Sequence, residues 1–165
     1  MTVKSVKGAS TVVMLGATLA FVLVLFLDWH RTTVDVAGLA TVQTEEMGWS
    51  GWGWLAGAAG ITLLLVNLNH LQRGFEPDAA FGITDLLLGT VMVSATVAAV
   101  FSGESTVQVA TVGVELGTVL WPAWVGLVLA WVVEVSAVLV ALPEPWQPGR
   151  RLPEAGLRGE VELRR

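Results

Sequence analysis

The chain has no cysteine, only two histidines and few charged residues. The absence of cysteine excludes disulfides, thiolate metal sites and cysteine nucleophiles. Asp, Glu, Lys and Arg make up 14% of the 165 residues, whereas a soluble domain usually carries about 25%. The net charge of -5 argues against nucleic-acid binding, because that binding neutralises phosphates with basic residues. The composition therefore argues against both a soluble globular domain and a nucleic-acid-binding protein.

Sequence signatures of enzyme chemistry are also missing. The chain contains no Gly-x-Ser-x-Gly elbow, His-Glu-x-x-His helix, phosphate-binding Gly-rich loop or dinucleotide fingerprint. Its many glycines fall within apolar runs or beside tryptophan, which suits helix packing and turns. We therefore expect no enzyme activity and no cofactor.

Apolar residues are abundant and occur in four long runs. They make up 54% of the chain, and the mean hydropathy is +0.69. A helix needs about 20 residues to cross the hydrocarbon core of a bilayer. The runs predict an all-α membrane protein, a four-transmembrane-helix bundle formed by residues 1–142, with helices at about 10–27, 53–71, 82–101 and 119–142. The remaining residues, 143–165, are rich in proline and arginine, and we expect them to form a disordered cytoplasmic tail.

The first run also has features of a secretory signal peptide, because Lys4 and Lys7 precede it. It ends in Phe-Leu-Asp-Trp without a small-x-small cleavage site. We therefore interpret it as an uncleaved first transmembrane helix.

The basic residues indicate how the helices are oriented. Eight of the nine lie before the first run, between the second and third runs, or in the tail, and only Arg31 lies elsewhere. The positive-inside rule makes their side cytoplasmic. We expect a multi-pass protein of the plasma membrane with both termini inside and outer loops at 28–52 and 102–118. His30 and His70 then lie on opposite sides of the bilayer, so one monomer cannot bring them to one metal or one catalytic dyad.

Both outer loops have strand-forming patterns. Residues 33–36 and 41–44 alternate apolar with polar side chains on either side of Ala37-Gly38, as in a hairpin. Residues 106–109 and 112–115 repeat the alternation. We expect a small extracytoplasmic β-rich patch drawn from the two loops, and irregular β-prone loops are the alternative.

Six residues of these loops form a predicted outer interaction patch. Tryptophan prefers the headgroup level of a membrane, and exposed strand edges are suited to pairing with another chain. The patch consists of Trp49, Trp52, Val34, Val36, Val107 and Val109.

Four helices with both ends inside and a longer, strand-forming first outer loop resemble the claudin-like tetraspan layout. The series Trp29, Gly48-Trp49 and Gly51-Trp52 resembles the Trp and Gly-x-Trp elements of that family's first loop. The paired loop cysteines of the family are missing, and the second helix begins almost directly after the tryptophans. The layout is also similar to that of small four-helix bacterial membrane proteins of unknown function.

The fourth run contains the residue that most suggests a site in the membrane. Glu134 lies eight residues from the end of that run, on a face with Gly126 and Ala130, and an ionisable residue within the membrane is a functional-site hypothesis by default. Asp85 and Asn67 are expected in the same half of the membrane. The three residues define a predicted intramembrane polar cluster that would pass protons, bind a cation or accept a partner's basic residue.

Each member of this cluster also has a structural interpretation. Asp85 or Thr84 would cap the third helix, while Asn67, Asn69 and His70 would be solvated at the headgroup level. Glu134 would be a protonated carboxyl hydrogen-bonded to a neighbouring helix, a working proton or ion site, or a contact with another subunit. The sequence leaves these alternatives open.

The outer loops also carry oxygen and imidazole groups that are metal ligands in other proteins: Asp28, His30, Asp35, Glu45 and Glu46. Their spacing matches no ligand motif, so a solvated acidic loop is favoured and no metal is expected. The outer loops carry six acids and one Arg, so they hold the whole net charge of -5.

The favoured function is a non-catalytic accessory, scaffold or interaction subunit of the cell envelope. Its partners would be the lipid bilayer and a protein or a second copy of the chain. The alternative is a small oligomeric proton- or ion-coupled transporter or channel that uses Glu134.

Overall fold

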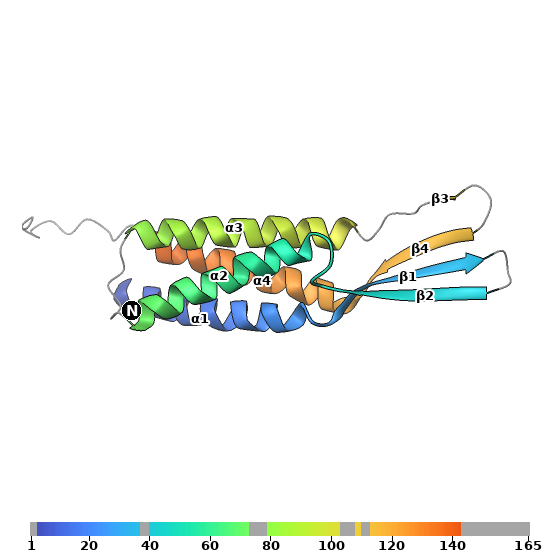
Figure 1. The fold of residues 1–165 in the computed structure, drawn as a ribbon. Coiled ribbons are helices and arrows are strands. Elements are labelled where there is room, and N and C mark those ends of the chain that lie inside the picture. The colour runs from blue at the N-terminus through green and yellow to red at the C-terminus, as the bar shows by residue number, and fades with distance from the viewer. Residues whose placement is uncertain (1–2, 37–39, 73–78, 103–107, 110–112, 143–165) are drawn as a thin grey trace, which may run out of the picture.

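The protein consists of four long helices with a narrow sheet at one end, as a computed structural model of the chain shows (Figure 1). The structure describes residues 3–36, 40–72, 79–102, 108–109 and 113–142. The helices are α1 (Val3–Val24), α2 (Gly53–Gln72), α3 (Ala79–Ser102) and α4 (Trp121–Ala141). The strands are β1 (Asp28–Val36), β2 (Ala40–Met47), β3 (Gln108–Val109) and β4 (Gly113–Val119).

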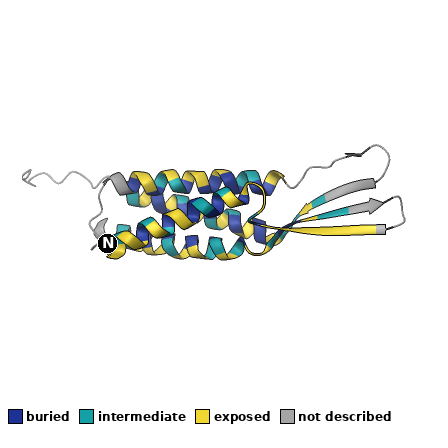
Figure 2. Cartoon of the chain, in the orientation of Figure 1, coloured by how far each residue is buried: buried dark blue, intermediate teal, exposed yellow. Residues whose placement is uncertain are grey.

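All four helices are long and apolar enough to cross a membrane. They contain 20 to 24 residues each, and the four predicted helices are present, with ends shifted by at most a few residues except at the start of α1. Large apolar side chains are exposed along each helix, among them Leu23, Leu65, Leu87 and Val128 (Figure 2). Such a surface suits contact with lipid, because soluble monomers rarely expose large contiguous apolar areas. The chain therefore has the features of a multi-pass membrane protein.

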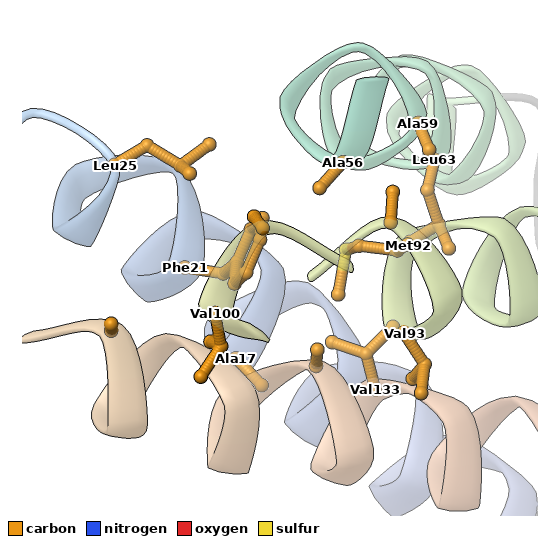
Figure 3. Packing of buried hydrophobic residues seen from close by; sticks show 14 of the residues in the cluster. Ala17, Phe21, Leu25, Ala56, Ala59, Leu63, Met92, Val93, Val100 and Val133 are labelled. Carbon is orange, nitrogen blue, oxygen red and sulfur yellow. The ribbon is translucent and has the colours of Figure 1, made fainter. Parts of the chain in front are cut away.

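The helices pack as a ring in which α4 contacts α1 and α3, and α2 contacts α3 and, less extensively, α1. Side chains from the four helices fill the centre, including Phe21, Leu63, Met92 and Val133 (Figure 3). Small residues of α2 and α4 are buried within the bundle, among them Ala56, Gly60 and Ala130. Small side chains let helix backbones approach closely, which drives association in lipid.

The sheet draws its strands from both loops at the same end of the bundle, as the alternating patterns predict. Its strand order is β2-β1-β4-β3, with antiparallel pairing throughout. β1 and β2 extend further toward the helices than the predicted segments 33–36 and 41–44, because the pairing starts at Asp28 and Met47. Ala37-Gly38, Val107 and residues 143–165 lie outside the described residues.

Trp29 joins the sheet to the bundle. Between the pairs Asp28↔Met47 and His30↔Glu46, β1 has one residue more than β2. This bulge explains why Trp29 and His30 are both buried, although consecutive residues of a regular strand face opposite sides. The indole Nε1 of Trp29 donates a 3.0 Å hydrogen bond to the carbonyl of Val24, the last residue of α1.

Two glycines make room for the Trp29 ring. A Cβ atom on Gly48 would lie 2.5 Å from the indole, and one on Gly126 of α4 would lie 2.6 Å from it. The backbone carbonyl of Trp29 also accepts a 2.7 Å hydrogen bond from the N–H of Leu120, just before α4. One side chain and its own backbone thus connect the end of α1, the end of β2 and the start of α4.

We predict that Gly126→Ala and Gly48→Ala each destabilise the protein by about 1–3 kcal/mol, because the added methyl group must displace a buried indole ring. The measurement is the free energy of unfolding in detergent micelles. Gly16→Ala in α1 is the matched control, since nothing lies within 4 Å of its Cβ position. If the three variants are equally stable, Trp29 does not have the structural role described here.

Candidate functional site

The predicted intramembrane cluster consists of two hydrogen-bonded pairs that share α3. The first joins α2 to α3: the side-chain amide of Asn67 donates to Asp85 Oδ1 over 2.8 Å, and also to the carbonyl of Leu63 over 3.0 Å. Both side chains are buried, with 5% and 4% of their surface exposed. His70, one turn beyond Asn67, is near enough to interact electrostatically with Asp85. Asp85 therefore bonds to the side chain of a neighbouring helix, beyond any role as a helix cap.

The second pair joins α3 to α4. Thr90 Oγ1 lies 2.9 Å from Glu134 Oε1 and also 2.9 Å from the carbonyl oxygen of Leu86. A hydroxyl has one proton, and a carbonyl can only accept. The Thr90 hydroxyl therefore donates to only one of these two acceptors at a time, and Glu134 competes for its proton with the carbonyl of Leu86.

The second carboxyl oxygen of Glu134 lies against the backbone of α3. Oε2 is buried and has no hydrogen-bond partner among the described residues. It occupies the place where a Cβ atom on Gly89 would stand. Glu134 as a whole is half-buried and Thr90 is exposed, so the pair lies at the rim of the α3–α4 contact and does not point into the centre of the bundle.

The two pairs lie close together along α3. Asp85 and Gly89 are four residues apart on one helix face, a rise of about 6 Å. Glu134 rests on Gly89, so its carboxyl lies about one turn from Asp85. α3 therefore brings the three predicted residues to one region, with Thr90 as the direct partner of Glu134.

The structure places three valines of the outer patch in the paired strands and separates its two tryptophans. Val34 pairs in register with Val42 of β2 and Glu115 of β4, Val36 pairs with Ala40, and Val109 pairs with Gly113. Trp52 is exposed at 54%. Trp49 is half-buried, its ring standing over Gly57 of α2 and edge-on to Phe26 at 5.6 Å. Trp49 therefore packs inside the protein, unlike Trp52.

β2 is the outermost strand on its side of the sheet, and its pairing with the described strands is to β1 alone. All seven side chains from Thr41 to Met47 are exposed. One exposed ion pair spans the two strands: Arg31 donates to Glu45 Oε1 through Nη2 at 2.7 Å and Nε at 3.0 Å. Glu46 remains beside it as an acid without such a partner among the described residues.

Sequence reasoning missed three contributors to these sites. Glu134 lies 44 residues after Thr90 and 45 after Gly89, and no spacing rule pairs residues at such separations. Trp29, which the sequence places in a series of loop tryptophans, is completely buried. The described residues contain no group of three or more His, Cys, Asp or Glu that could hold a metal ion.

No protein-family model, curated protein or solved structure matches this chain.

The Asn67–Asp85 pair yields a quantitative prediction. In a double-mutant cycle of Asn67→Ala and Asp85→Ala, we expect a coupling free energy of about 0.6–2 kcal/mol, the range of interhelical hydrogen bonds in membrane proteins. The measurement is unfolding in micelles. The control cycle pairs Asp85→Ala with Thr62→Ala, because Thr62 bonds only to its own helix at Ala58. Equal coupling in both cycles would show that the interhelical bond adds nothing.

Proposed function

We propose that the protein is a non-catalytic accessory, scaffold or interaction subunit of the cell envelope, which binds a protein partner by strand addition at β2. The observation that carries the proposal is the edge position of β2. It has eight residues, pairs on one side with β1, and exposes every described side chain. The backbone of such an edge is a template for another strand, and main-chain hydrogen bonds then supply the affinity.

The charge of the sheet indicates which partner strand fits. Glu45 is neutralised by Arg31, while Glu46 follows it without an ion pair among the described residues. Val42 and Met47 add apolar contact area, with 52% and 54% of their surfaces exposed. A neutral or basic strand with apolar residues suits this edge, whether it belongs to another protein or to a second copy of the chain.

The membrane arrangement that goes with this proposal is the one expected from the basic residues. The sheet end faces the outside of the plasma membrane, and both termini are cytoplasmic. Four helices and a sheet built from both outer loops support an analogy with the claudin-like layout in architecture, and fold analogy alone does not establish function.

Photo-cross-linking tests the interaction. With a photoreactive residue at Val42 of β2, we expect one cross-linked product in native membranes. The same residue at Val128, exposed on α4, should not give that product. A product of twice the chain mass would identify a second copy as the partner, and another mass would identify a different protein. Equal cross-linking from both positions contradicts docking at β2.

A pair of proline variants tests the strand-addition mechanism. Gln43 and Thr44 are adjacent in β2, so one N–H points to β1 and the other points outward. Of the variants Gln43→Pro and Thr44→Pro, we expect the one that removes the N–H pointing to β1 to lower the unfolding midpoint. The variant that removes the outward N–H should leave the midpoint unchanged and abolish the Val42 cross-link, since proline has no N–H to donate to a partner strand. Survival of the cross-link in both variants rules out main-chain pairing at this edge.

The second candidate function is a small oligomeric proton- or ion-coupled transporter or channel. The observation that favours it is the Glu134–Thr90 contact at the rim of the α3–α4 interface, with Asp85 one turn away along α3. A carboxyl and a neighbouring hydroxyl are groups that can pass a proton between them. Acids within a membrane often mark the route of a transported proton.

Flux measurements in proteoliposomes test this candidate. If Glu134 carries the transported proton, Glu134→Gln should abolish proton flux, because an amide cannot exchange a proton as a carboxyl does. Thr62→Ala, a hydroxyl removed from an exposed site on α2, should transport normally. A wild-type protein that moves no proton, or a Glu134→Gln variant that moves protons equally well, excludes transport through this residue.

A further inference from the structure

A small cavity lies where the sheet joins the bundle, and neither proposed function uses it. Its volume is about 70 Å³, which is enough for several water-sized groups. β1 contributes Trp29 and His30, the end of β2 and the following turn contribute Glu46 to Gly48 with Ser50 and Gly51, and α3 contributes Ala99 and Ser102. The polar groups of this lining are an imidazole, a carboxylate and two hydroxyls.

His30 is the unusual member of the lining. Its surface is 93% buried, since 7% is exposed, and its Nδ1 atom has no hydrogen-bond partner among the described residues. A buried polar atom without a partner costs about 1–3 kcal/mol, so the adjoining cavity is where a water or a bound group would satisfy this atom.

Glu46 lies directly across from His30. The two residues are register partners of β1 and β2, and side chains in such pairs share a face of the sheet with Cβ atoms about 5 Å apart. The Glu46 carboxylate makes one long contact, 3.4 Å from Ser50 Oγ, while that hydroxyl lies closer to the carbonyl of Met47, at 2.8 Å. The single Ser50 proton therefore goes to Met47, and the carboxylate is left available.

We propose that this cavity is a binding site for a divalent transition-metal ion, held by the imidazole of His30 and the carboxylate of Glu46. Zinc lies about 2.0–2.2 Å from the imidazole nitrogen and the carboxylate oxygen that bind it. Two side chains on directly paired strand residues can both reach one ion at these distances. Ser50 Oγ and water complete the coordination. Two such protein ligands, where three or four are usual, make this an open and exchangeable site.

The surroundings favour a cation of this class. The outer loops hold six acids and one arginine, and a field of one sign raises the local concentration of counter-ions. An imidazole ligand selects zinc, copper or nickel over magnesium and calcium, which prefer oxygen. A bound ion would join β1 and β2 beside the end of α3.

Calorimetry on the full chain in detergent tests the site, with Zn²⁺ as the probe and about 0.15 M salt to screen the diffuse charge of the acids. We expect one Zn²⁺ per chain and no comparable binding of Mg²⁺. His30→Ala and Glu46→Gln should each weaken Zn²⁺ binding by at least about tenfold, the smallest effect typical for groups around a metal. Zn²⁺ should raise the unfolding midpoint of the wild type and not that of these variants.

The chain supplies a matched control for each substitution. His70→Ala removes the other histidine, which lies near the far end of α2, and Glu45→Gln removes the neighbouring acid, which pairs with Arg31. Both should bind Zn²⁺ as the wild type does. Glu46 is exposed, so Glu46→Gln keeps the test valid if His30→Ala fails to fold. Absence of Zn²⁺ binding, equal binding of Mg²⁺, or equal loss in the Glu45 and Glu46 variants overturns the proposal.

Discussion

The packing of the Trp29 ring between Gly48 and Gly126 is the constraint on which the arrangement of sheet and bundle depends. The ring reaches this position because the bulge in β1 turns it toward the helices, and its Nε1 hydrogen bond to Val24 closes the end of α1. A side chain larger than hydrogen at either glycine would occupy the space of the indole. Gly48 directly follows β2 and Gly126 lies in α4, so the ring holds the end of β2 against the start of α4. The positions of the candidate sites at the sheet relative to the bundle therefore depend on this contact.

The same bulge also buries His30, which a regular strand would have turned outward if Trp29 faced the bundle. A histidine in the open sheet would be solvated and would have no need of a ligand. Burial removes water from the imidazole, and its register partner Glu46 stays at the exposed edge. The burial of His30 beside the cavity and the tryptophan contact are therefore both consequences of one extra residue in β1.

The sequence predicts the helices and strands, because each follows from a pattern shared by many residues. It does not predict features that depend on a single tertiary contact. Apolar run length determines the four helices, because each must cross a hydrocarbon layer of nearly fixed thickness, and alternation determines the strands of both loops. The burial of Trp29 was missed because its amphipathic ring suits the headgroup level equally well, and only tertiary contact with two distant glycines decides between these positions. Asn67 and Asp85 were expected in the same half of the membrane, and their bond agrees with that expectation. The partner of Glu134 was not predicted, since no sequence spacing links it to Thr90.

The two intramembrane pairs differ in how far their contacts offset the free-energy cost of placing an acid in the membrane. Placing an ionised acid such as Asp at the centre of a membrane helix costs about 2.5–3.5 kcal/mol on insertion scales, whereas an interhelical hydrogen bond contributes about 0.6 kcal/mol on average. Asp85 reduces its cost through burial beside an amide and through its place in the first turn of the apolar span that begins at Gly82. Glu134 is further from its helix ends, half-exposed, and holds one contact with Thr90 while Oε2 has no partner among the described residues. One such bond does not offset the cost of an ionised carboxylate there. Packing and the contact with Thr90 therefore do not by themselves explain the presence of Glu134 in α4.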